Sequence, residues 1–160
     1  MADFGALADS VIKGNADLAK RLTEQAISEG VPPGNIMSSG LIAGMEVVGR
    51  KFKANEFYLP EVLVAARAMH SGLAVLKPHL EASGAEPAGH VVIGTVKGDL
   101  HDIGKNIVAM MLTGAGYEVK DLGADVPPET FVETAKQYRK CVVGMSALLT
   151  TTMLNMREVI

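Results

Sequence analysis

The spacing of apolar residues changes near the middle of the chain, and this change most constrains the fold. Residues 1–82 repeat apolar side chains at helical intervals, as in the steps of four, three and four between Leu41 and Phe52. From Val91 onward, short apolar runs alternate with helical segments. The chain is therefore expected to fold as a helical part followed by an α/β part.

The helical part is predicted to be a four-helix bundle. Helices are expected over residues 3–13 and 17–29, then after Pro32-Pro33, and finally for about six turns from Pro60. Proline is tolerated in the first turn of a helix, so it can mark these starts. Residues 83–90 are small and polar and are interrupted by glycine and proline, which predicts a linker after a domain of residues 1–82.

The second part, residues 91–160, is predicted to be a doubly wound parallel sheet. Its first run, VVIGTV, is continuous and β-branched, as in a strand buried on both faces. Strands and helices then alternate up to a helix at about residues 152–160. Three strands are few for an open sheet, so we expect this α/β domain to be truncated and the native protein to continue.

Composition excludes several classes of function. The net charge is −3 and the Lys and Arg residues are scattered, which argues against a nucleic-acid partner. Apolar stretches shorter than about 20 residues predict no membrane span. The N-terminus has no basic and apolar segments of a signal peptide. A single cysteine, Cys141, excludes an internal disulfide and favours a cytoplasmic location.

The loop after the first strand, residues 97–104, is the candidate for chemistry. In open α/β sheets, ligands bind beyond the carboxyl ends of the strands. His101 lies just before a helix, where the positive end of the helix dipole favours a neutral ring that can bind a metal. Asp99 is a plausible acceptor for the other ring nitrogen. Asp102 is expected to cap the following helix.

A single histidine in a loop is more often an ordinary surface residue than a metal ligand, and this interpretation stays open. No second His or Cys stands at zinc spacing, so a metal here would take one ligand from the protein and the others from a macrocyclic cofactor. The glycine patterns of phosphate-binding loops are absent, and the acidic side chains of the loop would repel phosphate.

The six residues from Asp99 to Gly104 have the form DxHxxG, which resembles the signature of cobalamin-binding domains. The longer stretch TVKGDLHDIGKN is similar to the corrinoid module of methionine synthase and to the corrinoid proteins of methanol, methylamine and O-demethylase systems. This resemblance implies a Rossmann-like domain that binds cobalamin or a related corrinoid. It also implies that His101 is the lower axial ligand of cobalt and that Asp99 is its hydrogen-bond partner.

Two further segments resemble the same family. Ser146-Ala147-Leu148 followed by Thr150 matches an SxLxT pattern, although such a pattern is weak by itself. The resemblance implies that Ser146 extends a proton relay from Asp99 and His101, and that Thr150 lines the slot for the nucleotide tail. Residues 122–127, LGADVP, are expected to form a positioning loop without a chemical role.

The helical part is similar to the helical cap of methyltransferase modules in the stretch KFKANEFYLPEVLVAARAM. This similarity implies that Phe52, Leu59 and Val62 approach the upper face of the cobalt. The same apolar spacing is usual in the core of a bundle, so both interpretations stay open, as they do for Phe57 and Tyr58. The predicted cofactor-binding residues are Gly98, Asp99, Leu100, His101, Asp102, Ile103, Gly104, Ser146, Leu148, Thr150, Phe52, Leu59 and Val62.

The resemblance implies a methyl carrier, not a complete enzyme. Its expected partners are a substrate-specific methyltransferase and a corrinoid:acceptor methyltransferase, with a reductive activase as a third candidate and with no nucleic acid or membrane. A mutase small subunit is an alternative, but proteins of that class lack such a helical cap, so residues 1–82 argue against it. A corrinoid sensor would need a DNA-binding domain, and a flavodoxin-like or receiver domain would bind no corrinoid.

Overall fold

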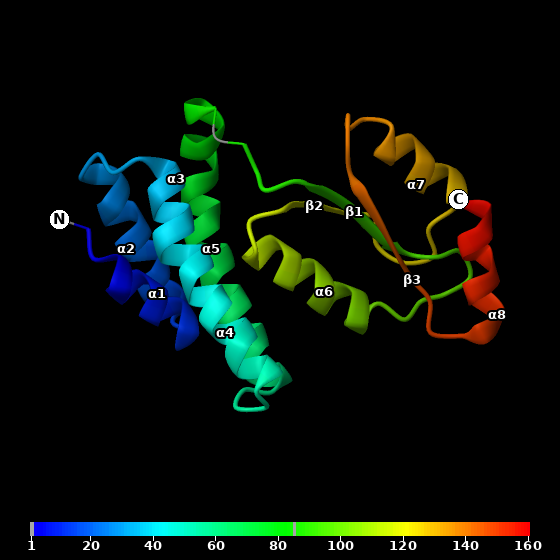
Figure 1. Ribbon diagram of the computed structural model, residues 1–160, viewed down its shortest axis with the longest axis horizontal. Coiled ribbons are helices and arrows are strands. Elements are labelled where there is room, and N and C mark those ends of the chain that lie inside the picture. The colour runs from blue at the N-terminus through cyan, green and yellow to red at the C-terminus, as the bar shows by residue number, and fades with distance from the viewer. Residues whose placement is uncertain (1, 85) are drawn as a thin grey trace. The chain divides into compact units, whose positions relative to one another are not determined.

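The computed structural model describes residues 2–84 and 86–160, and the chain divides into two compact units (Figure 1). A helical unit comprises residues 1–86 with 114–116, and an α/β unit comprises residues 87–113 with 117–160. The predicted fold class, helices followed by a parallel sheet with alternating helices, is confirmed.

The helical unit contains α1 (Phe4–Ile12), α2 (Ala16–Ser28), α3 (Pro33–Ile36), α4 (Ala43–Lys53) and α5 (Leu59–Ser83). Short polar side chains begin the first two helices, because Asp3 accepts the N–H of Ala6 and Asn15 accepts the N–H of Leu18. The third predicted helix is not uniform. A π-helical segment, Met37–Ile42, joins α3 to α4, and the apolar spacing gave no sign of it.

Small residues let the helices of this unit approach closely. A side chain at Gly72 would lie 2.8 Å from Leu41, and one at Gly44 would lie 2.8 Å from the carbonyl oxygen of Ala8. The bundle core is formed by buried aliphatic side chains, which include Leu7, Val11, Ile36, Leu41, Val48, Val62, Met69 and Leu76.

The last helix of this unit, α5, is longer and more apolar than the sequence analysis expected. Among the described helices, α5 is the one that is long and apolar enough to cross a membrane, with a mean hydropathy of 1.3 over an 18-residue stretch. Its buried residues, such as Ala65, Ala66 and Ala68, belong to the bundle core. Core packing therefore accounts for part of the apolar composition of α5, whereas Leu63 and Val64 of the same helix are exposed.

The α/β unit contains three parallel strands in the order β2-β1-β3: β1 (His90–Thr95), β2 (Glu118–Asp121) and β3 (Val142–Ser146). Its helices are α6 (Ile103–Gly114), α7 (Pro128–Ala135) and α8 (Thr150–Met153), and a 3₁₀ turn, Leu154–Glu158, follows. The helix α7 ends at Ala135, and the last helix starts at Thr150 instead of at about residue 152.

The central strand β1 positions the candidate site. It is buried on both faces, and a side chain at Gly94 would lie 2.8 Å from the fully buried ring of Phe131, so glycine makes room for that ring. Beyond β1, the N–H of Val96 donates to the carbonyl oxygen of Ser146 (3.0 Å). The loops that follow β1 and β3 therefore begin side by side at the carboxyl edge of the sheet.

Candidate cofactor-binding site

His101 and Asp99 form a hydrogen-bonded pair in the loop between β1 and α6. The Nδ1 atom of His101 lies 2.7 Å from Oδ1 of Asp99, and the backbone N–H of His101 donates to the same oxygen (3.0 Å). A carboxylate only accepts hydrogen bonds, so a neutral ring holds its proton on Nδ1 and has a free lone pair on Nε2. The Asp99 side chain is fully buried, whereas the His101 side chain is 53% exposed. The ring can therefore meet a ligand while its partner stays fixed.

The second oxygen of Asp99 is held by residues that follow β3. Oδ2 accepts the N–H of Leu148 (2.9 Å), the N–H of Leu149 (3.3 Å) and the hydroxyl of Thr152 (2.6 Å). The hydrogen bonds from Thr152 and from the backbone of His101 hold the pKa of the Asp99 carboxyl well below its ordinary value. These contacts therefore favour the anionic form of Asp99, which accepts a hydrogen bond from Nδ1–H of His101.

The structure corrects the third member of the predicted relay. Ser146 is the last residue of β3, and none of the hydrogen bonds among the described residues joins its hydroxyl to Asp99. Thr152 occupies that place instead, because α8 begins at Thr150 and its first turn brings the buried Thr152 back toward the sheet edge. Thr150 itself is exposed at the start of α8.

Two residues at the start of α6 also differ from expectation. The Asp102 side chain accepts from the side-chain amide of Asn106 (3.1 Å), and within the described chain it accepts no backbone N–H of the first turn, so it is not the predicted side-chain cap. Lys105, which the sequence analysis missed, is buried and donates to the carboxylate of Asp121 (2.6 Å). This ion pair fixes the start of α6 to the end of β2.

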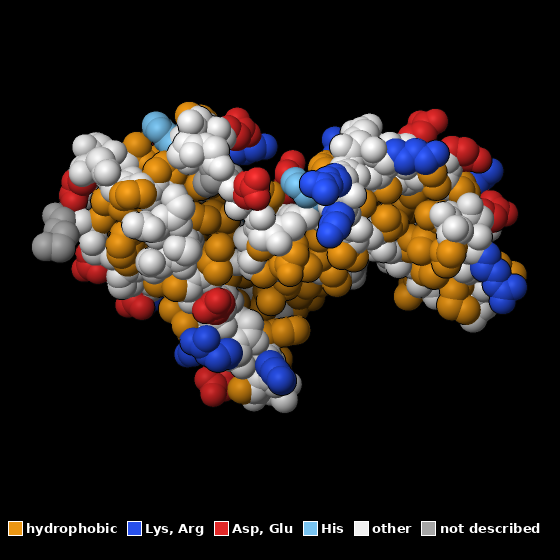
Figure 2. All heavy atoms as spheres, turned by 45° about the horizontal axis from the view of Figure 1, so that its top comes forward, with side chains coloured by type: hydrophobic (Ala, Val, Ile, Leu, Met, Phe, Trp, Pro, Cys, Tyr) orange, Lys and Arg blue, Asp and Glu red, His pale blue; other side chains and the backbone are white. Residues whose placement is uncertain are grey.

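Apolar side chains surround the pair without packing into the protein. Leu100 is 75% exposed, Ile103 is 74% exposed and Leu148 is 67% exposed. Figure 2 shows that hydrophobic side chains are frequent on the visible surface of the α/β unit. Apolar groups that are exposed together often mark a binding surface.

Gly104 supports the same conclusion from the backbone. It lies in the first turn of α6, and a side chain there would meet no protein atom within 4 Å. Glycine inside a helix costs about 0.5–1 kcal/mol relative to alanine. Packing within the protein does not require this glycine, and the open space beside it is compatible with the close approach of a ligand.

The donor set fits a metal that has most of its ligands from elsewhere. Among the described residues, no three or more His, Cys, Asp or Glu side chains gather where they could hold a metal ion. Nε2 of His101 would thus be a single protein ligand. This arrangement suits a macrocycle that occupies the other positions around the metal.

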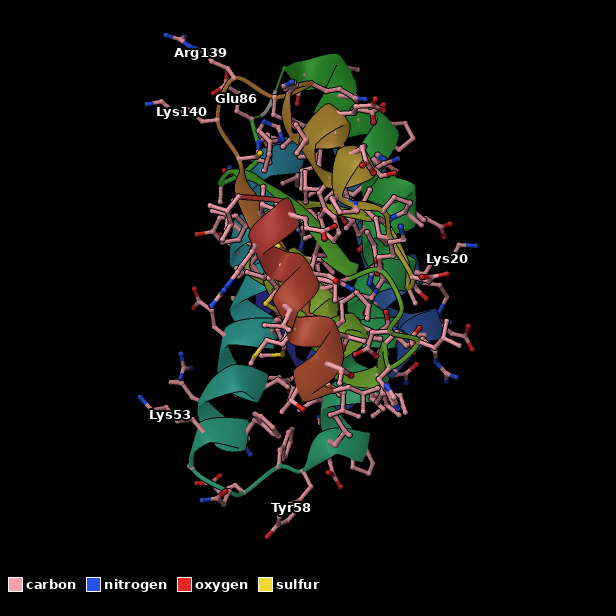
Figure 3. All side chains as sticks on the ribbon, turned by 90° about the vertical axis from the view of Figure 1, so that its right-hand side faces the viewer. Lys20, Lys53, Tyr58, Glu86, Arg139 and Lys140 are labelled. Atoms are coloured by element: carbon pink, nitrogen blue, oxygen red, sulfur yellow. The ribbon has the colours of Figure 1, made fainter. Side chains whose placement is uncertain are left out.

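The predicted cap residues fall into two groups. Val62 is 1% exposed and belongs to the bundle core, so its burial favours the core role over contact with a ligand. Phe52 is 42% exposed and Leu59 is half-buried at the start of α5, so both offer some surface. Tyr58 projects from the loop between α4 and α5 (Figure 3), and Phe57 packs under the Lys51 ammonium at 4.9 Å.

Comparison with known families agrees with this site. A family described as B12 binding domain matches residues 4–77, and a second family with the same description matches residues 89–160. A corrinoid protein of Desulfitobacterium hafniense is 44% identical over 96% of this chain and 73% of its own length. The trimethylamine corrinoid protein of Methanosarcina barkeri is 48% identical over 89% of this chain and 67% of its own length.

Solved structures show the same relationship. A chain of the methanol:cobalamin methyltransferase complex from Methanosarcina barkeri superposes with a TM-score of 0.88 at 36% identity, covering 98% of this chain. This chain spans 60% of the length of that one. A cobalamin-binding protein from Desulfitobacterium hafniense gives a TM-score of 0.74 at 30% identity. The chain therefore belongs to the family of corrinoid proteins, whose B12-binding module combines a helical part with an α/β part.

Proposed function

We propose that this chain binds a corrinoid through Nε2 of His101 and serves as a methyl carrier between two methyltransferases. The observation that supports it most directly is the 2.7 Å contact between Nδ1 of the half-exposed His101 and the fully buried carboxylate of Asp99. Relatives named trimethylamine corrinoid protein, and the similar chain from a methanol:cobalamin methyltransferase complex, support the carrier role. When bound, the corrinoid supplies a cobalt ion that can accept and release a methyl group.

The residues of the loop prepare the histidine for this role. The anionic Asp99 accepts a hydrogen bond from Nδ1–H and thereby raises the basicity of Nε2. The Thr152 hydroxyl and two backbone N–H groups hold that carboxylate in place. Leu100, Ile103 and Leu148 would exclude water around the ring.

Other residues are assigned by position. Gly98 and Gly104 would let the cofactor approach the backbone, and Ser146 and Thr150 would line the slot for the nucleotide tail. Phe52 and Leu59 would shield the opposite face of the cofactor. The partners are a substrate-specific methyltransferase, a corrinoid:acceptor methyltransferase and a reductive activase, and the protein works in the cytoplasm without nucleic acid or membrane.

The test of the ligand is electron paramagnetic resonance of the Co(II) form. Protein labelled with ¹⁵N-histidine is reconstituted with unlabelled hydroxocobalamin and reduced. Histidine ligation gives a doublet from ¹⁵N, whereas the cofactor's own ¹⁴N base gives a triplet. His101→Ala should abolish the doublet, and His70→Ala, at an exposed position in α5, should retain it. A wild-type triplet would exclude His101 as the ligand.

The test of the carrier role is a transfer assay. The reduced, cofactor-loaded protein is mixed with a methylamine- or methanol-specific methyltransferase and its isotope-labelled substrate. Label should appear on the cofactor of the wild type and pass to a thiol when an acceptor methyltransferase is added. A protein that binds corrinoid but takes up no label from methyltransferases of methanol, methylamine or O-demethylase systems would not be a methyl carrier, which would favour a sensor or a mutase subunit.

A further inference from the structure

Asp125 adopts a backbone conformation that is rare for its residue type. It lies in the loop between β2 and α7, and its φ of 55° falls in the left-handed region. Besides glycines, the described chain has one other residue with a positive φ, Asn55. Aspartate and asparagine tolerate this region because their short side chains form local hydrogen bonds. Such conformations persist where the surrounding contacts fix them, often at functional sites.

The contacts of Asp125 reach the loop that contains His101. The backbone N–H of Asp125 donates to the carbonyl oxygen of Asp99 (3.0 Å), and the N–H of Gly98 donates to Oδ1 of Asp125 (2.7 Å). Residue 125 therefore holds both sides of the two-residue segment Gly98-Asp99. With this positive φ, the backbone N–H and the carboxylate of Asp125 both contact that segment.

We propose that Asp125 is a positioning residue for the cobalt ligand, acting on His101 through the backbone of Asp99. Asp99 is held at both ends: the segment after β3 fixes its carboxylate, and the backbone N–H of Asp125 fixes its carbonyl oxygen. Loss of the Asp125 contacts leaves the carboxylate bonds but lets the backbone of Gly98-Asp99 shift. The backbone that carries His101 then moves relative to that fixed carboxylate, so the 2.7 Å contact between Nδ1 of His101 and Oδ1 of Asp99 is no longer held. This inference rests on the proposed function and gives a role to the loop 122–127.

Two substitutions at residue 125 distinguish the effect of its side-chain acceptor from the effect of its backbone conformation. Asp125→Gly permits a positive φ but has no acceptor for the Gly98 N–H. Asp125→Asn keeps an oxygen at the Oδ1 position and the tolerance of positive φ, and removes only the charge. Asn55→Gly is the matched control, since it removes a side chain from the same backbone conformation in the helical unit.

The first measurement uses cofactor-free protein. Amide exchange of Gly98 should be about tenfold faster in Asp125→Gly, as expected for the loss of one hydrogen bond. Nuclear magnetic resonance of ¹⁵N-histidine protein should show His101 protonated at Nδ1 in the wild type and in Asp125→Asn, and a mixture of tautomers in Asp125→Gly. Asn55→Gly should match the wild type in both. Thermal melts by circular dichroism establish that all variants are folded.

The second measurement is the ¹⁵N doublet of the reconstituted Co(II) form, which should weaken in Asp125→Gly and remain in Asp125→Asn. The inference is overturned if Asp125→Gly equals the wild type in tautomer and doublet, or if Asp125→Asn loses both as fully as Asp125→Gly. If the wild type shows no doublet while the cofactor-free variants still differ in tautomer, the proposed ligand fails and the positioning of His101 by Asp125 stands.

Discussion

At the scale of single residues, the site depends on the buried carboxylate of Asp99, which accepts several hydrogen bonds. Asp99 accepts two hydrogen bonds from His101 and three from the segment that contains Leu148, Leu149 and Thr152. Burial alone would raise the pKa of a carboxyl group, yet the hydrogen bonds to Asp99 outweigh it and the pKa is lowered. The environment therefore selects the anion, and the anion selects the tautomer of His101.

The lowered pKa of Asp99 predicts a pH dependence of stability. The folded state binds the proton less readily than the unfolded state, so the contribution of Asp99 is complete above the ordinary aspartate pKa of about 3.9 and decreases as the pH falls below it. Asp99→Asn should be less stable than the wild type at neutral pH, and the difference should shrink in acid. Urea unfolding of both proteins from pH 7 downward measures it, and a constant difference would contradict the prediction.

The hydrogen bond from the Thr152 hydroxyl to Asp99 predicts that two substitutions of Thr152 will differ in their effect on the pKa of Asp99. Thr152→Val has nearly the same shape but lacks the hydroxyl that donates to Asp99 at 2.6 Å, so it should raise the pKa of Asp99. Thr152→Ser keeps a hydroxyl and should behave like the wild type. Carbon-detected titration of the Asp99 carboxyl group measures the pKa directly. Equal titration curves for the valine and serine variants would show that the hydroxyl has no effect.

At the scale of helices and strands, two glycines lie in opposite surroundings, one crowded and one open. Gly94 in β1 makes room for Phe131, whereas the space beside Gly104 in α6 is open. Alanine at the first position should therefore be harmful to folding, and alanine at the second should be harmful to binding alone.

Gly104→Ala should stabilise the cofactor-free protein by less than the ~0.5–1 kcal/mol that applies in the middle of a helix, because alanine is the better helix former but this position lies in the first turn. The added methyl group should at the same time weaken corrinoid binding. Urea unfolding and titration with hydroxocobalamin measure the two effects separately. A variant with gained stability and unchanged affinity would mean that no ligand approaches this glycine.

Gly94→Ala should destabilise the protein by about 1–3 kcal/mol, as expected for overpacking against a buried ring. Adding Phe131→Leu to the Gly94→Ala protein should restore part of the lost stability, because the smaller side chain leaves room for the added methyl group. A double-mutant cycle in urea measures the coupling, and simple additivity of the two changes would argue against the predicted clash.

The sequence predicted those parts that depend on local patterns. The order of strands and helices follows from periodicity, and the pair Asp99 and His101 follows from a short motif after a buried strand. Thr152 could not be chosen over Ser146 because the choice depends on where α8 begins among three adjacent threonines. Residues 122–127 were expected to form a positioning loop, but Asp125 could not be singled out within it because its two contacts join loops that are far apart in sequence.

At the scale of the whole molecule, bound corrinoid should stabilise the folded state by mass action, by about 2.7 kcal/mol when the ligand is at a hundredfold its dissociation constant. Hydrogen exchange should slow at residues 97–104 and 146–152, which contain the site. Protection that extends to the segment from Phe52 to Leu59 would support the predicted cap role. Protection elsewhere, with none at residues 97–104, would place the cofactor outside this site.

The distance in sequence between Asp99 and the groups that hold its carboxylate has a consequence for biosynthesis. Leu148 and Thr152 follow Asp99 by 49 and 53 residues, so the loop cannot take its final form until the third strand and the start of α8 have joined the sheet. Domains fold during synthesis as their segments leave the ribosome. A nascent chain that displays His101 but not yet residues 148–152 therefore lacks the groups that hold the Asp99 carboxylate, and its histidine is not yet positioned.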